Sequence, residues 1–180
     1  VFVDINPDTF NMDADSLSAA ITTSLESGLT PKVVIPVGLF GQPADYDRIS
    51  DVSDEHGVWV LDDAAQSFGS SYKGKSVGSF GRVTGTSFYP SKPLGCYGDG
   101  GAVFTNDPEM SDRMRRIRVH GNGGGQGEVS RLGLTARMDS LQAAVLLAKL
   151  SIFEEECKVR NAVAERYSLA LKDFVQTPSL

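Results

Sequence analysis

The chain has 180 residues, and its 41% hydrophobic content is enough to bury the core of one domain. Its 17 Lys and Arg are outnumbered by 23 Asp and Glu, giving a net charge of −6. That balance argues against nucleic acid or an anionic membrane as the main partner, and no apolar run approaches the roughly 20 residues that a membrane-spanning helix needs.

Cysteine and histidine usage narrows the chemistry further. Cys96 and Cys157 show no disulfide-framework spacing, so we expect free thiols and a reducing, cytoplasmic compartment. His56 and His120 are not at metal-ligand spacing, so we expect no zinc site. Because the chain opens inside an apolar stretch, we expect it to be part of a longer protein.

Apolar runs and helical patterns alternate along the chain. We expect five strands, at residues 1–5, 33–37, 58–61, 84–88 and 101–105. We expect four helices: one capped by Asp13 or Asp15 and ending at Gly28, one from about 44 to 57, one starting at Asp107-Pro108, and a long one over about 139–171.

Helical spacing also predicts which side chains face inward. In the first helix these are Leu17, Ala20, Ile21 and Leu25. In the long helix they are Leu141, Ala144, Val145, Ala148, Ile152 and Phe153. Lys73-Gly74 predicts a tight turn between two short segments, and the glycine-rich residues 120–130 predict a loop.

This alternation indicates an α/β fold with a mostly parallel sheet and helices on both faces. We find neither an internal repeat nor a domain boundary, so residues 1–180 are predicted to form a single partial domain. Ligands bind such sheets beyond the carboxyl ends of the strands.

Two chemically distinctive groups fall at strand ends. Asp62 and Asp63 directly follow one predicted strand, and Lys92 lies in a Ser/Pro-rich turn after the next. A lysine in partly dry surroundings can lose its proton and attack an aldehyde, forming a Schiff base. On these residues alone, a structural Asp–Lys ion pair is an equally good interpretation.

A set of ordered motifs adds a family resemblance. The stretches are 60–69 (VLDDAAQSFG), 72–75 (YKGK), 87–92 (SFYPSK), 98–102 (GDGGA) and 137–144 (RMDSLQAA). Together they resemble the DegT-type nucleotide-sugar aminotransferases, which are fold-type I enzymes that use pyridoxal 5′-phosphate. The resemblance implies that the chain is the central part of the cofactor-binding large domain, ending in the long helix that leads toward a small domain. The family's N-terminal Gly-Thr segment, which cradles the cofactor phosphate, is not in this sequence.

The resemblance implies a role for each matching residue. Lys92 corresponds to the Schiff-base lysine and proton shuttle, and Asp63 to the carboxylate that pairs with the pyridine nitrogen. Gln66 corresponds to a residue beside the ring and its hydroxyl, and Ser87 to a phosphate-binding hydroxyl. Asp62 would point to the opposite face of its strand, because adjacent side chains alternate.

A second set of implied contacts involves a partner subunit. Arg137 corresponds to a residue that reaches the cofactor phosphate of the neighbouring subunit, which implies a homodimer with shared active sites. Relatives usually carry Asn where this chain has Thr135. Tyr89 and His120 could contact the sugar or simply pack.

The stretches 91–101 (SKPLGCYGDGG) and 147–156 (LAKLSIFEEE) most resemble enzymes that aminate the 3-keto group of UDP-2-acetamido-2-deoxy-3-oxo-glucuronate, for bacterial O-antigen lipopolysaccharide. Glutamate is the implied amino donor. Two alternatives remain open: a sugar dehydratase of the same fold, in which histidine replaces the lysine, and a non-catalytic truncated or regulatory domain.

Overall fold

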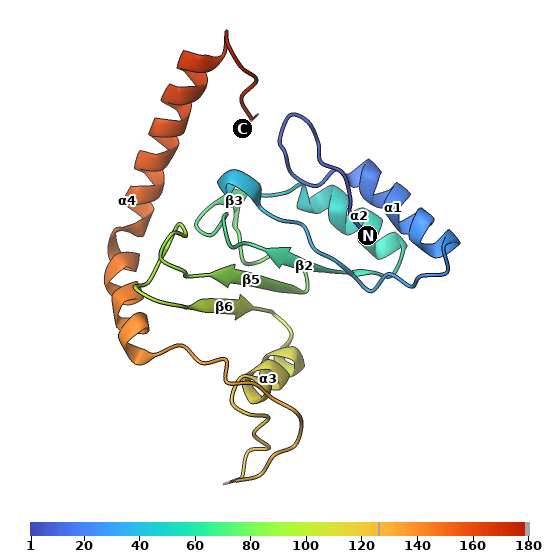
Figure 1. The fold of residues 1–180 in the computed structure, drawn as a ribbon, viewed down its shortest axis with the longest axis vertical. Helices are drawn as coiled ribbons and strands as arrows, with labels where there is room; N and C mark the ends of the chain where they lie inside the picture. The colour runs from blue at the N-terminus through green and yellow to red at the C-terminus, as the bar shows by residue number, and fades with distance from the viewer. Residues whose placement is uncertain (126, 179–180) are drawn as a thin grey trace.

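A computed structural model describes residues 1–125 and 127–178, and Figure 1 shows its arrangement around one small sheet. The sheet has four strands in the order β1-β2-β5-β6. Their bounds are β1 Val33–Val34, β2 Trp59–Asp63, β5 Val83–Ser87 and β6 Gly101–Phe104. β1, β2 and β5 run parallel, and β6 pairs antiparallel with β5. The mostly parallel sheet is therefore confirmed, with one reversed edge strand.

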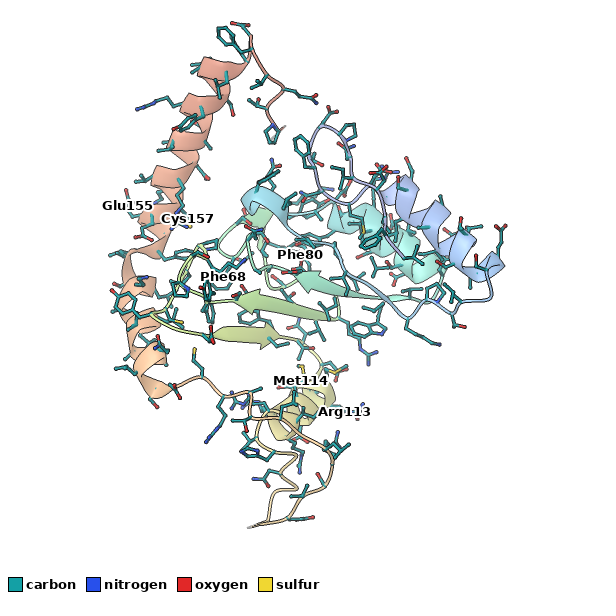
Figure 2. All side chains as sticks on the ribbon, viewed as in Figure 1. Phe68, Phe80, Arg113, Met114, Glu155 and Cys157 are labelled. Atoms are coloured by element: carbon teal, nitrogen blue, oxygen red, sulfur yellow. The ribbon has the colours of Figure 1, made fainter. Side chains whose placement is uncertain are left out.

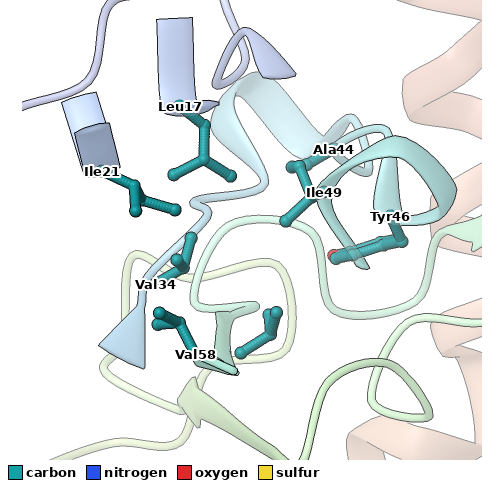
Figure 3. Close-up of a cluster of buried hydrophobic side chains, with 8 residues drawn as sticks. Leu17, Ile21, Val34, Ala44, Tyr46, Ile49 and Val58 are labelled. Atoms are coloured by element: carbon teal, nitrogen blue, oxygen red, sulfur yellow. The ribbon is translucent and has the colours of Figure 1, made fainter. Parts of the chain in front are cut away.

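Two helices cover one face of this sheet. They are α1 (Ala14–Glu26) and α2 (Tyr46–Glu55). Each begins at an aspartate whose side chain accepts a backbone N–H of the first turn: Asp13 accepts from Ser16, and Asp45 from Arg48. Figure 3 shows the core that they build against the sheet, which consists of Leu17, Ile21, Val34, Ala44, Tyr46, Ile49, Val58 and Val60.

The other two helices lie below the sheet and beside it in Figure 1. α3 (Pro108–Ile117) follows β6, with Asp107 capping its first turn. α4 (Ser140–Leu171) is the long helix along one side of the sheet. Figure 2 shows Phe68 and Cys157 between α4 and the sheet, in a second apolar cluster with Phe88, Leu94, Cys96, Leu146 and Phe153.

The remaining segments are short. η1 (Leu39–Gly41) is a 3₁₀ turn, and β3 (Ser71–Tyr72) and β4 (Lys75–Ser76) form a hairpin. The hairpin turns at Lys73 and Gly74, which both have positive φ, as a tight two-residue turn requires. Residues 120–130 form a loop as expected, except that residue 126 lies outside the described residues.

Three sequence predictions about elements were wrong. Residues 1–5 form no strand and make only one isolated bridge, between Ile5 and Met12, since a strand needs a neighbour to pair with. β1 stops at Val34, and Pro36 beyond it lacks the N–H that a continued ladder would use. The inner face of α1 does not extend to Leu25, which is 50% exposed.

The buried face of α4 also differs from the prediction. Leu146 and Phe153 are its two buried residues, whereas Leu141 and Ile152 are mostly exposed. Apolar residues occur around most of this helix, so periodicity alone could not select the side that packs. The loop after β5 makes that selection, because it supplies Leu94 and Cys96 to the shared cluster.

Over the described residues, the structure contains no helix that is both long and apolar enough to cross a bilayer.

Candidate active site

The face of the sheet away from α1 and α2 forms the floor of a wide, open pocket of about 1400 Å³. Side chains that alternate along the strands reach it from β2, β5 and β6. The ends of two parallel strands contribute Asp63 and Ser87, and the segment before β6 contributes Asp99. Of the residues that the sequence placed on one rim, Asp63 and Ser87 line this pocket, whereas Asp62 and Lys92 do not.

Asp62 and Asp63 point to opposite faces of β2. Asp62 is fully buried on the α2 side, where its Oδ1 accepts a hydrogen bond of 2.7 Å from the Tyr46 hydroxyl. Burial raises the pKa of Asp62 to about 6. Burial and the neighbouring Asp62 raise the pKa of the Tyr46 hydroxyl, so Tyr46 remains a donor. Asp62 is thus part of the packed layer beneath α2.

Asp63 faces the pocket instead. It is partly exposed, and its Oδ1 accepts a 3.0 Å hydrogen bond from the Ala65 backbone N–H, which ties the carboxylate to the turn that follows β2. Gly85 lies directly opposite Asp63 in the strand register. A Cβ added to Gly85 would meet nothing within 4 Å, so the floor beside the carboxylate is open.

Lys92 is held in a compact turn at the carboxyl end of β5. Its backbone N–H donates to the Tyr89 carbonyl at 2.9 Å, and the Tyr89 N–H donates to Ser87 Oγ at 3.2 Å. The chain then folds back, so that the Cys96 N–H bonds the Phe88 carbonyl at 2.8 Å. Lys92 is half-buried, and within the described part of the chain its ammonium has no hydrogen bond or ion pair.

The pocket brings together some of the predicted site residues and not others. Asp63, Ser87 and Arg137 line it. The other four predicted residues do not line the pocket: Gln66, Tyr89, Lys92 and His120. No Asp–Lys ion pair joins Lys92 to either aspartate among the described residues, which removes the structural ion-pair interpretation left open by the sequence.

His120 is occupied by a local contact. Its Nδ1 lies 3.3 Å from the Thr135 hydroxyl, and the Val119–Thr135 bridge joins the two segments. His120 also has a positive φ of 57°. Thr135 therefore holds this loop in place in the single chain.

The sequence analysis did not identify the positively charged side of the pocket. Ser111, Arg115 and Arg118 line it from α3 and the turn that follows, at spacings of four and three residues. The cluster of arginines at helical spacing was visible in the sequence. Only the tertiary structure shows that Arg115 and Arg118 are directed to the same pocket as Asp63.

Comparison with known proteins identifies relatives of this chain. Residues 1–179 match the DegT/DnrJ/EryC1/StrS aminotransferase family. The chain is 51% identical over 179 residues to UDP-2-acetamido-2-deoxy-3-oxo-D-glucuronate aminotransferase of Pseudomonas aeruginosa, covering 99% of this chain and 48% of that protein.

Solved structures show the same similarity. A DegT/DnrJ/EryC1/StrS aminotransferase from Brucella abortus superposes with a TM-score of 0.97 at 50% identity, covering all of this chain and 48% of that one. DesV of S. venezuelae, solved in complex with a ketimine intermediate, has a TM-score of 0.89 at 34% identity with the same coverage.

The chain spans about half the length of these relatives. Within that span, the match runs through nearly every residue and includes the strands and turns that carry the pocket. The chain belongs to the DegT/DnrJ/EryC1/StrS aminotransferase family.

Proposed function

We propose that the full-length protein carrying this chain transfers an amino group to a keto group of a nucleotide sugar, using pyridoxal 5′-phosphate. One observation carries the proposal. In a chain of this family, Asp63 and Ser87 line one open pocket at the ends of neighbouring parallel strands, where α/β folds bind ligands. Residues 1–180 are then the central part of the large domain, and α4 leads toward the small domain.

The residues present fit that cofactor. A protonated ring nitrogen needs a carboxylate, which Asp63 offers, and a phosphate needs hydroxyl and cationic groups, which Ser87 and Arg137 of the partner subunit would offer. The absent side chain at Gly85 leaves space beside Asp63 for a flat ring.

When bound, the cofactor supplies an aldehyde that takes up amino groups and a ring that accepts an electron pair. The chain's residues control the protons around it. Asp63 would keep the ring nitrogen protonated, Lys92 Nζ would move a proton to and from the reacting carbon, and Gln66 would lie beside the ring and its hydroxyl. Ser87 would bind the phosphate of its own site, and Arg137 would reach the phosphate in the site of the partner subunit.

We propose UDP-2-acetamido-2-deoxy-3-oxo-glucuronate as the amino acceptor, since the Pseudomonas aeruginosa relative carries that substrate in its name. Glutamate is the proposed donor, and the product would enter O-antigen lipopolysaccharide. Tyr89, which is 54% exposed, and His120 are proposed sugar contacts. The proposed location is the cytoplasm, in keeping with the two free cysteines.

The relatives described above do not favour the alternatives. Each is named as an aminotransferase or as a protein holding a ketimine. Lys92 is present where sugar dehydratases of this fold carry histidine.

Borohydride trapping tests the proposal. Reduction of the full-length protein with its cofactor should fix one pyridoxyl group, and peptide mapping should find it on Lys92. Lys73, which pairs with Asp47, and Lys75 on the hairpin serve as internal controls. An adduct on either control lysine, or none on Lys92, would refute the assignment.

A further inference from the structure

The segment that follows Lys92 has few backbone bonds of its own. Among the described residues, one backbone N–H between Pro93 and Tyr97 donates to a backbone carbonyl: that of Cys96, which donates to Phe88. Three further backbone groups of this segment, the carbonyls of Pro93 and Gly95 and the N–H of Tyr97, are bound by side chains of α4, a helix that begins more than forty residues later.

Three side chains of α4 make these bonds. Arg160 donates to the Pro93 carbonyl at 3.0 Å, and the Lys149 ammonium donates to the Gly95 carbonyl at 2.6 Å. Gln142 Oε1 accepts from the Tyr97 backbone N–H at 2.8 Å. Later residues of the loop pair with earlier residues of α4, so the loop runs antiparallel to the helix.

The three side chains share one stripe of α4. Their positions differ by seven and by eleven residues, which at 3.6 residues per turn places them within about 20° of one another. Leu146 and Phe153 lie on the same side and pack in the cluster that contains Leu94 and Cys96. Polar bonds and apolar packing therefore act on the loop from one helix face.

Gly95 of this loop packs directly against the turn that carries Lys92. A Cβ added to Gly95 would lie 2.5 Å from the Pro90 carbonyl oxygen and 2.9 Å from that of Tyr89. Only glycine fits so close to those two oxygens. The Tyr89 carbonyl is the acceptor for the Lys92 N–H, so Lys149, Gly95 and the Lys92 turn form one contiguous chain of contacts.

Lys149 is the strongest member of this set. It is half-buried, its bond is charge-assisted, and its ammonium also lies 5.1 Å from the centre of the Tyr97 ring. Lys158, on the same helix, is a matched contrast. It is mostly exposed and pairs with its own-helix neighbours Glu154 and Glu155.

We propose that Lys149 is a positioning residue, which holds the Gly95 carbonyl and thereby fixes the turn from which Lys92 presents its amine. This inference rests on the proposed function of Lys92. A reacting amine displaced by about 1 Å can cost about a hundredfold in rate, so anchoring its backbone has a direct consequence.

The test compares Lys149→Met, Lys149→Arg and Lys158→Met in the full-length protein. The first measurement is amide hydrogen exchange over residues 94–98 in protein stripped of cofactor. Loss of one bond should speed exchange at Cys96 and Tyr97 by about fivefold to tenfold in Lys149→Met. Arginine can still donate to the carbonyl, so Lys149→Arg should exchange like the wild type, as should Lys158→Met.

The second measurement is the rate at which added pyridoxal 5′-phosphate attaches to Lys92. The amine and the aldehyde condense with release of one water, and borohydride then reduces the bond so that peptide mapping can quantify it. We expect attachment to slow about tenfold or more in Lys149→Met, with a fall in kcat rather than a rise in KM for the sugar.

The possible results distinguish the positioning role of Lys149 from the proposed function of Lys92. Unchanged exchange and unchanged attachment in Lys149→Met overturn the positioning role, as does faster exchange spread over the whole protein, which would mean general destabilisation. Failure of Lys149→Arg to recover either rate also overturns it. Attachment of the cofactor to another lysine in the wild-type protein would instead refute the proposed function.

Discussion

At the scale of single residues, two adjacent aspartates have opposite surroundings. Asp62 is fully buried against Tyr46, while Asp63 opens onto the pocket. Alternation along a strand is enough to separate them. Substitutions of the two aspartates should therefore have different effects on activity.

We expect Asp63→Asn to lower turnover by about two orders of magnitude or more, because a neutral amide no longer holds the ring nitrogen protonated. Asp62→Asn should cost far less, since the side chain does not reach the pocket. Steady-state kinetics of the two variants of the full-length protein decide the point. Equal losses, or a greater loss at Asp62, would contradict the assignment.

Asp62 should also make stability depend on pH. Its pKa is about 6 in the folded protein and ordinarily 3.8, so folding favours the protonated form. The unfolding free energy that it contributes should fall as the pH rises from about 4 to about 6 and stay constant above that window. The fall should amount to about 3 kcal/mol.

Urea unfolding of the full-length protein and of Asp62→Asn at pH 4, 5, 6 and 7 measures this contribution. Asn does not titrate, so the difference between the two proteins isolates Asp62, and any pH-independent cost of the substitution cancels. A difference that stays constant over this range would show that Asp62 titrates normally in the fold.

At the scale of elements, β5 carries a glycine, Gly85, on the face that lines the pocket, so one position in that row has no side chain. Glycine weakens a strand interior and often marks a close approach by a ligand. Gly85 needs no unusual φ, and a Cβ there meets nothing within 4 Å. Neither close packing nor backbone conformation requires glycine here, so its role is better explained as keeping space open in the pocket.

We expect Gly85→Val to weaken binding of pyridoxal 5′-phosphate about tenfold or more by filling the floor beside Asp63, while Gly85→Ala has a smaller effect. Valine suits strands, so the thermal unfolding temperature of the cofactor-free protein should not fall. Cofactor titration followed by absorbance gives the affinity. Normal affinity in Gly85→Val would place the ring elsewhere.

At the scale of the whole molecule, the segment 127–137 has an unusual exposure. All its residues are exposed in the single chain, and Arg137 at its end still lines the pocket beside Asp63 and Ser87. Exposure over such a stretch is expected of a surface that packs against a partner, as the proposed homodimer requires.

Subunit mixing tests that arrangement. Lys92→Ala and Arg137→Ala should each be inactive, and a mixed dimer of the two should recover part of the activity, because one of its sites would hold both wild-type residues. The preferred acceptor should be the 3-keto glucuronate rather than a 4-keto-6-deoxy sugar. Absence of rescue in verified mixed dimers would assign Arg137 to the site of its own chain.

The sequence alone determined much of this protein. Asp13, Asp107 and Gly28 marked helix ends, Lys73-Gly74 marked a hairpin, and uninterrupted apolar runs marked parallel strands. These signals are local, since a cap or a turn depends on residues a few positions apart. The order of the motifs also indicated the family, which the comparisons confirmed.

Only the tertiary structure decided which surfaces meet. The strand predicted at residues 1–5 is absent because strand pairing needs a neighbour that local sequence does not specify. The packing side of α4, the turn of Arg115 and Arg118 toward the pocket, and the bond from Lys149 to Gly95 all join residues distant in sequence. Local patterns define each helix and strand, but a contact between two of them forms only where the packed core brings them together.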